Sequence, residues 1–428
     1  MTMFFLFASF SVLILLNIPV AAAMGLATMI GIEAEGLGVS NFANLIYSSI
    51  DKSVLLAIPF FILAGVLMDY AGISSRLIRF AQVCVGHIHG GMAVVAVLTA
   101  CFFAAISGSS PATVAALGGI LIPAMTASGY NQNMAASLVA ASGGIGIIIP
   151  PSIAFVIFAM LSDISVGNLF ICGIVPGLVM GLAYIIAAYW SIRNDKNIVR
   201  QKRASFPEVM RAFKDAIWGL LTPVIILGGI YGGVFTPTEA AGVAVMYGLF
   251  VGLFIYREIK FRDLWRLFVD SAVTSAIVMF LLSCAGVFGW LLTVSGVAEE
   301  LSIALMSTSS NQYVILLLIN VLFLIAGCFI EANAAYCIFL PILLPILHNM
   351  DYNIYAFGVF MVSSFAVGMI TPPVGPNLYV ACNIMKISMR DICSRVFPFV
   401  LAGMSAVILF TYVPQISLFL PRLLGLRV

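Results

Sequence analysis

The sequence predicts an all-α, multi-pass membrane protein built from two inverted-topology repeats. Hydrophobic residues make up 63% of the 428-residue chain and charged residues only 8%, far from the composition of a soluble domain. Apolar runs of about 18 residues or more, long enough to cross a membrane, recur along its length. A glycine- and proline-containing motif also occurs twice, 222 residues apart, so that residues 144–151 match residues 366–373.

The two copies are expected to keep one register on both sides of this motif, without a gap. Upstream and downstream matches at the same spacing are Ser109 with Glu331, Pro123 with Pro345, Tyr130-Asn131 with Tyr352-Asn353, Ser142 with Ser364, and Ala159 with Ala381. This repetition predicts a first repeat over 1–195, a basic cytoplasmic loop over 196–216, and a second repeat over 217–428.

Ten ordinary spans are expected in chain order. They lie near 1–18, 20–38, 51–72, 137–160, 166–192, 217–236, 238–256, 268–295, 357–384 and 397–420. The first resembles the apolar region of a signal peptide, but it lacks a positive leader and a small-residue cleavage site, so we interpret it as a retained span.

Two further apolar pairs, 91–127 and 311–348, are interpreted as re-entrant hairpins. Their arms have about 15–18 residues each, short for a crossing that requires about 20. Short polar tips join the arms, at 107–111 in the first pair and 331–333 in the second. The alternative is two ordinary spans in each pair, joined by a turn outside the bilayer.

The Pro150-Pro151 and Pro372-Pro373 pairs fall inside apolar segments. Proline has no backbone N–H and its ring clashes with the preceding turn, so each pair breaks its helix. The segments 137–160 and 357–384 are therefore expected to be broken helices. Interrupted helices at matching places in two halves are the best sequence indication of a transporter's binding site.

The distribution of positive charge predicts the topology. Basic residues crowd 193–214 and 257–266, and both loops are cytoplasmic by the positive-inside rule; neither indicates nucleic-acid binding. The two broken helices then run in opposite directions, because each half has five spans and one hairpin. An odd number of crossings inverts the second copy. Arg422 and Arg427 at the C-terminal end would lie outside, against the rule.

No residue pattern indicates an enzyme. The eight cysteines are scattered singly without metal-ligand spacing, and no zinc-protease motif, nucleophile elbow or phosphate-binding loop is present. The glycines at 143–146 lie in an apolar helix before prolines, which disfavours a dinucleotide site. We therefore expect neither enzymatic activity nor an organic cofactor.

The hairpin tips and helix breaks favour a different chemistry. Unwound backbone at membrane depth leaves carbonyl groups that need partners, and a dehydrated Na⁺ ion is a suitable one. Hydroxyl and amide oxygens that could add to such sites are those of Ser107, Ser109, Ser110, Asn333 and Thr371. Helix back-bonding or close packing of small residues is the alternative role for these side chains.

Three polar residues are candidates to contact a substrate directly. Glu331 is the only charged residue between Leu301 and Met350, and an ionisable group at membrane depth is a functional candidate. The alternative is that its hairpin tip is exposed to an aqueous cavity. Ser152 follows the first proline pair and could orient a carboxylate, and Asn377 follows the second. Glu239, after Thr236-Pro237, either caps a helix or contacts another protein.

Several motifs together resemble the large membrane subunit of TRAP (tripartite ATP-independent periplasmic) transporters. They lie at 109–116, 148–152, 236–241 and 370–375, and the likeness covers nearly the whole chain. Segments 108–111 and 145–152 are most similar to sialic-acid members, although C4-dicarboxylate members share much of the pattern. No Arg or Lys lies in either hairpin or in the first break, which favours a monocarboxylate with many hydroxyls.

The resemblance implies a multi-pass protein of the bacterial inner membrane, in a phospholipid bilayer. It would work with a small four-helix membrane subunit and a periplasmic substrate-binding protein. Transport would be driven by two or more Na⁺ ions, with an elevator-like movement of a core against a scaffold. A stand-alone Na⁺/anion symporter of related architecture is the alternative.

The resemblance also implies where ions and substrate bind. The first Na⁺ site would involve Ser107, Gly108, Ser109, Gly144, Gly146 and Pro150. The second would involve Glu331, Ala332, Asn333, Gly368, Thr371 and Gly375. Substrate would lie between the hairpin tips, and the candidate contacts are Ser107, Ser109, Ser152, Glu331, Asn333 and Asn377.

Overall fold

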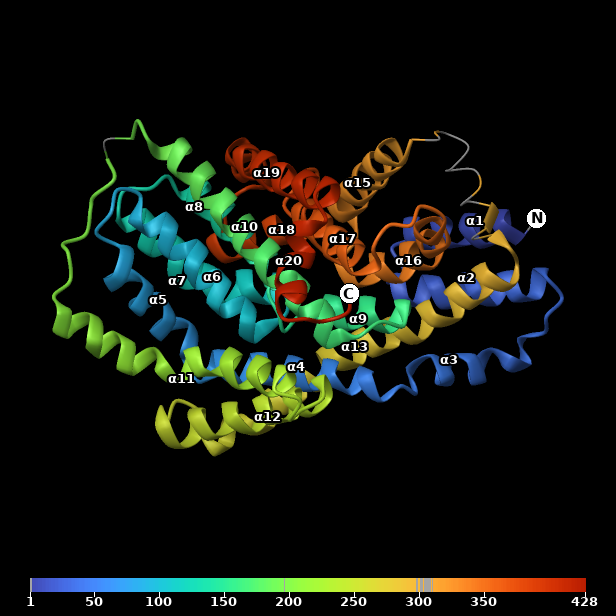
Figure 1. The fold of residues 1–428 in the computed structure, drawn as a ribbon, viewed down its shortest axis with the longest axis horizontal. Helices are drawn as coiled ribbons and strands as arrows, with labels where there is room; N and C mark the ends of the chain where they lie inside the picture. The colour runs from blue at the N-terminus through green and yellow to red at the C-terminus, as the bar shows by residue number, and fades with distance from the viewer. Residues whose placement is uncertain (1, 196, 298, 301–302, 304–308, 310) are drawn as a thin grey trace.

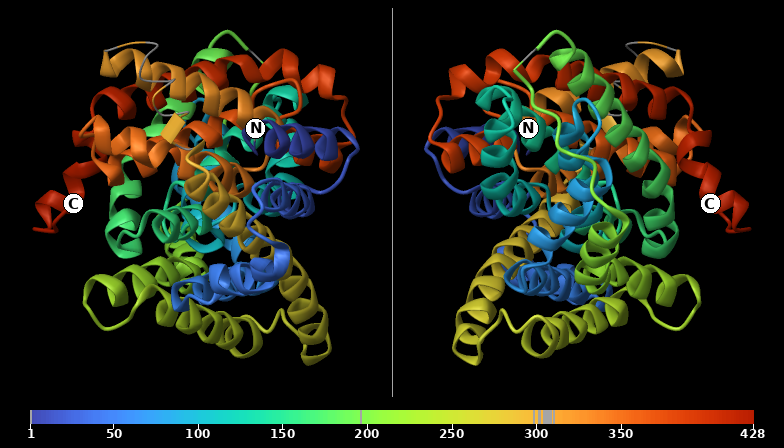
Figure 2. Two further views of the ribbon diagram at one scale, coloured as in Figure 1. Left: turned by 90° about the vertical axis from the view of Figure 1, so that its right-hand side faces the viewer. Right: turned by 90° about the vertical axis from the view of Figure 1, so that its left-hand side faces the viewer.

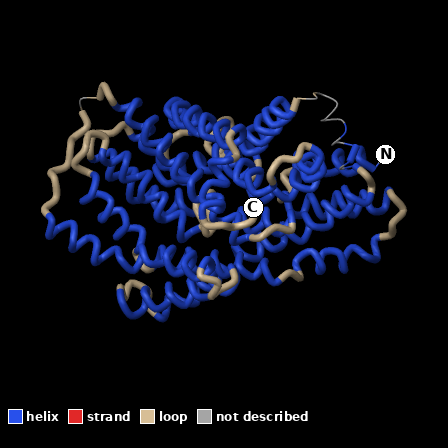
Figure 3. The backbone as a smooth tube through the Cα atoms, viewed as in Figure 1, coloured by secondary structure: helices blue, strands red, loops and turns tan. Residues whose placement is uncertain are grey.

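A computed structural model describes residues 2–195, 197–297, 299–300, 303, 309 and 311–428, and these ranges contain helices and loops but no strand (Figure 3). The first half contains α1 (Thr2–Leu15), α2 (Val20–Ala34), α3 (Phe42–Ile50), α4 (Ala57–Tyr70), α5 (Ile73–Val85), α6 (Gly91–Ser107), α7 (Ser110–Ala127), α8 (Gln132–Gly144), α9 (Ile153–Ser162) and α10 (Val166–Ile192). The second contains α11 (Phe206–Tyr231), α12 (Pro237–Phe250), α13 (Phe261–Val294), α15 (Gln312–Phe329), α16 (Ala332–Asn349), α17 (Ile354–Gly368), α18 (Pro376–Met385), α19 (Met389–Tyr412) and α20 (Gln415–Leu423).

Helices α8 and α17 begin in the same way in the two halves. Asn131 and Asn353 precede them, and each side-chain oxygen accepts hydrogen bonds from two backbone N–H groups of the first turn. Asparagine is among the best residues at this position because it satisfies amides that the helix leaves unpaired. Both helices then stop before a proline pair, as the sequence predicts.

Beyond the proline pairs the register of the repeat changes by one residue. Ser152 precedes α9, whereas Gly375 precedes α18. Both helices end in a left-handed residue, Asp163 (φ 54°) and Lys386 (φ 53°), which keep the new spacing. The expected match of Ala159 with Ala381 is therefore wrong, because two residues, Val374 and Gly375, separate the second proline pair from α18, whereas only Ser152 separates the first pair from α9.

The two hairpins, α6–α7 and α15–α16, are re-entrant. At the base of the first, the Ser128 carbonyl accepts a hydrogen bond from Val199 N at 3.0 Å, just beyond the end of α10. At the base of the second, Tyr412 donates to the Tyr313 carbonyl at 2.9 Å, at the end of α19. Each hairpin thus begins and ends at one side of the molecule.

The two hairpins enter from opposite sides. The residues before α8 lie beside the segment that follows α10, and Ser137 in α8 donates to the Ile392 carbonyl at the start of α19. The end of α10 and the start of α19 therefore lie together, so these two packed helices are antiparallel. This arrangement is the inverted repeat that the sequence predicts.

The helices form two units. Helices α2, α3, α4, α11, α12 and α13 make a scaffold, in which α4 packs against α12 and α13 (Figure 1). Helices α6–α10 and α15–α19 make the second unit, named here the hairpin unit, and the side views of Figure 2 show it stacked on the scaffold. Helix α5 connects them, since it packs against both α11 and α6.

Several helices extend beyond the expected spans. Helix α11 begins at Phe206, so the second half of the predicted loop 196–216 is largely helical. Ser205 and Glu208 cap that start. Helix α19 begins at Met389, where Ser388 accepts from Asp391 N. Such polar first turns carry no hydropathy signal. The short helices α3 and α5 lie outside the expected spans because they are too short to cross a membrane, and most of α20 falls within the span expected over 397–420.

Eight helices, counted among the described residues, are long and apolar enough to cross a membrane. Helices α1 and α2 are shorter than the spans expected for them, and α8–α9 and α17–α18 are each divided by a break. The number of crossings cannot be read from hydropathy alone, because α7 and α15 reach span length although they are hairpin arms.

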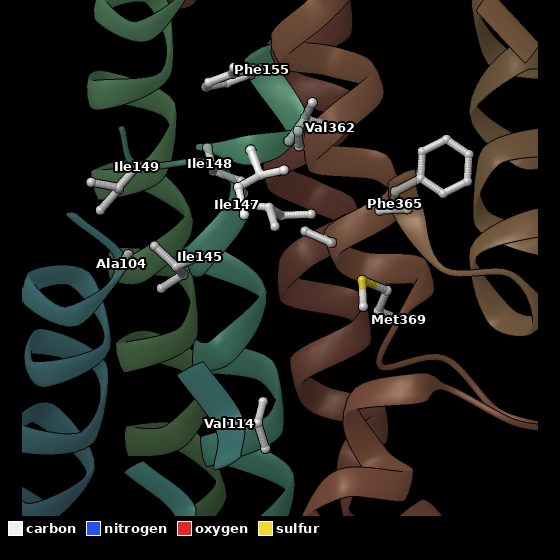
Figure 4. Close-up of a cluster of buried hydrophobic side chains, with 14 of the residues drawn as sticks. Ala104, Val114, Ile145, Ile147, Ile148, Ile149, Phe155, Val362, Phe365 and Met369 are labelled. Atoms are coloured by element: carbon white, nitrogen blue, oxygen red, sulfur yellow. The ribbon is translucent and has the colours of Figure 1, made fainter. Parts of the chain in front are cut away.

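The two breaks meet inside the hairpin unit. Ile147 and Ile148 from the first break lie toward Val362 and Phe365 of α17, whereas Ile145 faces α10 near Gly181 (Figure 4). The helices approach closely here, because a Cβ atom added to Gly144 would lie 3.1 Å from the Ala366 carbonyl oxygen. The breaks are therefore enclosed by apolar side chains.

Helices α15 and α17 touch through backbone at Gly327 and Gly368. A Cβ atom on Gly368 would lie 2.7 Å from Cα of Gly327, which is closer than Cβ atoms approach other heavy atoms in proteins. We expect Gly368→Val to lower the free energy of unfolding by about 3 kcal/mol, the upper part of the usual range for overpacking. Thermal unfolding in detergent measures this effect.

Gly119→Val is the matched control, since nothing lies within 4 Å of a Cβ added there. It should leave the unfolding midpoint close to that of the parent protein. Equal midpoints for the two variants would contradict the packing described for Gly327 and Gly368.

Candidate functional site

A cavity of about 320 Å³ separates the two hairpin tips from the scaffold. Its lining residues are Ser107, Ser109, Ala112, Ala116, Phe103 and Ile153 near the first tip, Glu331 and Asn333 at the second, and Ile62, Gly65, Val66, Asp69, Thr274, Ile277 and Val278 from α4 and α13. The structure therefore brings together four of the predicted substrate contacts: Ser107, Ser109, Glu331 and Asn333.

The first tip sits directly on the first helix break. Gly108 adopts φ +62° and closes α6, a conformation that favours glycine. Its carbonyl accepts a hydrogen bond from Ile153 N at 3.2 Å, at the start of α9. A Cβ atom on Gly108 would lie 2.8 Å from the Pro151 carbonyl oxygen, so the tip and the break are in backbone contact.

Part of the predicted first ion site is assembled at this junction. The Ser109 carbonyl accepts from Thr113 N at 3.1 Å and from Thr113 Oγ1 at 2.7 Å. Gly146 lies against both, since its added Cβ would be 3.0 Å from the Ser109 carbonyl oxygen. The junction of the first tip and the first break thus brings together four residues of the predicted site: Ser107, Gly108, Ser109 and Gly146. Gly144 faces α17 instead, and Pro150 forms the break beneath.

The second tip has a different construction. Asn333 Nδ2 donates to Glu331 Oε1 at 2.7 Å, and both side chains line the cavity. The tie between this hairpin and its break lies deeper, where Gly375 N donates to the Cys328 carbonyl at 3.0 Å. Thr371 Oγ1 donates to the Val367 carbonyl, which is the helix back-bonding alternative for that residue.

The residues of the predicted second ion site accordingly fall into two groups, one at the tip and one deeper in the hairpin unit. Glu331 and Asn333 line the cavity, and Ala332 is buried beside them. Gly368 packs on Gly327, and Gly375 pairs with Cys328. Assignment of these residues to one ion stays a prediction.

Ser152 and Asn377 lie outside the cavity lining. Ser152 is buried and caps α9: its hydroxyl donates to the Ile147 carbonyl at 2.6 Å and accepts from Phe155 N. Asn377 Nδ2 donates to Ser110 Oγ at 2.7 Å and to the Ala140 carbonyl at 3.1 Å. The two residues hold the helix breaks in place, and no described cavity presents them to a substrate.

Asn377 retains one unused acceptor. Its Oδ1 atom is buried and receives no hydrogen bond from any described residue. A buried polar atom without a partner costs free energy, and such atoms often mark the position of a water molecule or ion. The amide joins α18, α7 and α8, so this acceptor lies where the two repeats meet.

The scaffold contributes residues that the sequence did not indicate. Asp69 on α4 and Thr274 on α13 line the cavity opposite the tips, and a Cβ on Gly65 would lie 3.3 Å from Ser107 Cα. Thr113 was also missed. Its spacing of four residues from Ser109 was the available signal, whereas nothing near Asp69 distinguished it from the end of an ordinary span.

The charges around the cavity are unbalanced. Asp69 and Glu331 line it, and no lysine or arginine does so among the described residues. Nearby carboxylates lower the affinity of a site for an anion and raise it for a cation. An anionic ligand in this cavity therefore requires cations that the protein side chains do not supply.

These features define a class of protein. Two inverted repeats, each with a re-entrant hairpin and a broken helix, enclose a cavity with acidic and hydroxyl groups against a scaffold, which is the construction of a secondary transporter of the elevator type. The chain belongs to the DctM component family of tripartite ATP-independent periplasmic transporters, whose family model matches residues 7–416. It is a multi-pass inner-membrane transport protein and not an enzyme.

Curated relatives support this membership. The chain is 43% identical over 97% of its length to the isethionate TRAP transporter permease protein DctMQ of Oleidesulfovibrio alaskensis, and it spans 65% of that protein. It is 35% identical to the C4-dicarboxylate large permease DctM of Rhodobacter capsulatus, with full coverage of both chains. Identity to the sialic acid permease SiaT of Haemophilus influenzae is 32%, over 96% of this chain and 67% of that protein.

A solved structure shows the same fold. The Alcanivorax borkumensis YdaH transporter superposes with a TM-score of 0.64 over 87% of each chain, at 15% sequence identity. At that identity the likeness establishes the architecture alone. It agrees with the scaffold and hairpin unit described above.

Gly108 provides a test of the junction between tip and break. We expect Gly108→Ala to cost about 1–2 kcal/mol for its left-handed backbone and about 1–3 kcal/mol more for the clash with the Pro151 carbonyl. Thermal unfolding in detergent would report both costs. Gly233→Ala is the matched control, because Gly233 has φ +68° with nothing within 4 Å. If the two variants lose equal stability, the contact with Pro151 does not restrict residue 108.

Proposed function

We propose that this chain is the membrane-embedded transport subunit of a Na⁺-driven, binding-protein-dependent importer of organic acids. The observation that carries the proposal is the cavity between the hairpin tips, which contains two carboxylates and no basic side chain among the described residues. An acid bound there needs accompanying cations. Na⁺ ions at the tip-and-break junctions would provide them.

The oxygen atoms at the junctions support Na⁺ as the coupling ion. Asn377 Oδ1 is buried without a partner, the Ser109 carbonyl lies beside Gly146, and the Pro151 carbonyl lies beside Gly108. Hard oxygen ligands of this kind suit a small cation. The proposed first ion site is the junction of Ser107–Ser109 with the break at 144–150, and the second is the junction of Glu331–Asn333 with the break at 368–375.

The substrate we favour is a monoanion that carries hydroxyl groups. Glu331 and Asn333 can accept hydrogen bonds from hydroxyls, and the absence of a lysine or arginine from the described lining disfavours a second acidic group. Sialic acid meets this description, and so does isethionate, a hydroxylated sulfonate. The relatives of this chain include permeases named for both of these substrates, and others named for C4-dicarboxylates and 2,3-diketo-L-gulonate.

The membrane potential can drive this transport. Two Na⁺ ions with one monoanion carry one net positive charge inward, which gains about 2.3 kcal/mol per 100 mV. The Na⁺ concentration gradient adds to this gain. A C4-dicarboxylate dianion with two Na⁺ ions would be electroneutral and would require a third ion for the same gain.

We propose that this arrangement is the inward-facing end of an elevator cycle. The cavity lies at the end of α4 that carries Asp69, and Arg76 just beyond forms an ion pair with Glu258 at 3.0 Å. This end of the scaffold also contains the basic segments that precede α11 and α13, so it is cytoplasmic by the positive-inside rule. Substrate would therefore leave toward the cytoplasm from this state.

A small four-helix membrane subunit and a periplasmic binding protein are the proposed partners. The binding protein would approach the face opposite the basic segments, where α12 begins. There Thr236 and Glu239 cap the helix reciprocally, which confirms the capping role expected for Glu239. A contact of this turn with another protein stays a proposal.

Reconstitution tests the function. We expect proteoliposomes with the large and small membrane subunits to accumulate radiolabelled sialic acid or isethionate only with a Na⁺ gradient and the binding protein, because the site holds an anion only with its cations. Uptake by this chain alone would instead establish a stand-alone symporter. Na⁺-dependent uptake restricted to a dicarboxylate would keep the mechanism and discard the monoanion.

Glu331→Gln tests the role of the second tip. Glutamine keeps an acceptor for Asn333 but removes the charge, so we expect the Na⁺ concentration that gives half-maximal uptake to rise about tenfold, equivalent to about 1.4 kcal/mol. Asp195→Asn, in the loop after α10, is the control and should match wild type, because asparagine keeps an acceptor for Asn197 N. An unchanged Na⁺ dependence in Glu331→Gln would remove this carboxylate from ion binding.

A further inference from the structure

Helix α4 has an ionisable residue near each end, and each lines a different cavity. The membrane span that contains α4 covers Ser53–Tyr70, a length of about 27 Å if it is helical throughout. Asp69 lies at its inner end and lines the tip cavity. Lys52 immediately precedes its outer end and lines a second cavity of about 530 Å³.

The second cavity lies between the scaffold and the hairpin unit. Its lining comes from α3 and α13 of the scaffold and from the ends of α9 and α16: Leu45, Ser48, Ser49, Leu282, Ala285, Gly286, Gly289, Trp290 and Thr293 on one side, and Met160, Leu161, Pro341, Leu344 and Pro345 on the other. Thr238 at the start of α12 donates to the Ser53 carbonyl. Lys52 is thus at the face opposite the basic segments.

Lys52 is free to attract an anion. Its Nζ atom lies 3.7 Å from the thioether sulfur of Met160, a weak acceptor, and it forms no ion pair with the described carboxylates. The described lining of this cavity contains a lysine, whereas the described lining of the tip cavity contains neither lysine nor arginine. The cation therefore faces a gap that an elevator movement would open to the periplasm.

Asp69, at the other end of α4, is a hydrogen-bonded carboxylate beside the tip cavity. Ser74 Oγ donates to its Oδ1 at 2.7 Å, which holds the side chain in place while leaving the carboxylate at the edge of the tip cavity. Asp69 and Lys52 belong to the scaffold and keep their positions. Glu331, in contrast, belongs to the hairpin unit and would travel with the substrate, so its charge cannot distinguish the two ends of the movement.

We propose that Lys52 and Asp69 are fixed scaffold charges that draw an anionic substrate into the transport site at the outer end of the elevator movement and expel it at the inner end. The proposal rests on the proposed function, import of an organic acid. At the outer end the substrate meets a lysine without a carboxylate partner. At the inner end the same substrate meets a fixed carboxylate across a narrow cavity, and like charges repel.

Transport kinetics separate the two charges. We expect Lys52→Met, which keeps the apolar stem, to raise the half-saturating concentration of loaded binding protein about tenfold, within the usual range for electrostatic steering. We expect Asp69→Asn, which keeps an acceptor for Ser74, to reduce about tenfold the internal substrate concentration that halves uptake. Radiolabelled isethionate and N-acetylneuraminate, used separately, are the probes.

Lys52→Arg and Asp69→Glu are the matched controls and should retain wild-type values, since they keep the charge. High ionic strength should reduce the differences between the neutral variants and wild type. Neutral variants that behave like wild type, or charge-keeping variants that fail equally, would overturn the proposal.

A second measurement needs no substrate. In detergent-solubilised protein, a cysteine at Thr293→Cys reports on the outer cavity and one at Asn333→Cys on the inner cavity. The readout is the ratio of the reaction rate with an anionic methanethiosulfonate to the rate with a cationic one. The background rate of the native cysteines, measured on the parent protein, is subtracted from each rate first. Lys52→Met should lower this ratio at residue 293, and Asp69→Asn should raise it at residue 333.

The two measurements distinguish the two ways to be wrong. Wild-type proteoliposomes without uptake of any organic acid would contradict the proposed function, whatever the reaction rates show. Unchanged rate ratios in both neutral variants would contradict the charge pair, even where Na⁺-driven uptake is present.

Discussion

The structure depends on the pairing of backbone groups where helices break inside the membrane. Each unpaired N–H or C=O costs several kcal/mol in a bilayer, so a break survives only against a partner. Ile153 N pairs with the Gly108 carbonyl, and Gly375 N pairs with the Cys328 carbonyl. Each broken helix is thus attached to its own hairpin. Backbone hydrogen bonds therefore fix each hairpin on its break, and side chains at both tips line the cavity that faces the scaffold.

Opposite charges are separated along the path that a substrate would follow. The basic residues that orient the chain lie on the cytoplasmic side, where Arg76 pairs with Glu258 and Arg79 with Asp215. These pairs join α5 to the rest of the scaffold, beside the cavity that Asp69 lines. All charged side chains in the described lining of the tip cavity are carboxylates. Basic residues therefore orient the protein, and acidic residues shape its binding site.

Fold class, hairpins and breaks were predictable because proline chemistry and hydropathy act locally. The pairs Pro150-Pro151 and Pro372-Pro373 end their helices through local backbone chemistry, which does not depend on contacts with distant segments. Side-chain directions were not predictable, because they follow from packing between distant segments. Asn377 therefore proved to bridge α18 to Ser110 and Ala140 instead of lining the cavity, and Asp69 reached the cavity through a scaffold contact that no motif encodes.

The extra residue in the second break limits the symmetry of the molecule. The two repeats superimpose in sequence up to the proline pairs, but Ser152 caps α9 with its side chain whereas Gly375 starts α18 through a left-handed backbone. The backbone therefore enters the two helices differently, extended at Ser152 and left-handed at Gly375. Two ions held there would have unequal affinities, and a single inserted residue would then determine the order in which they load and leave.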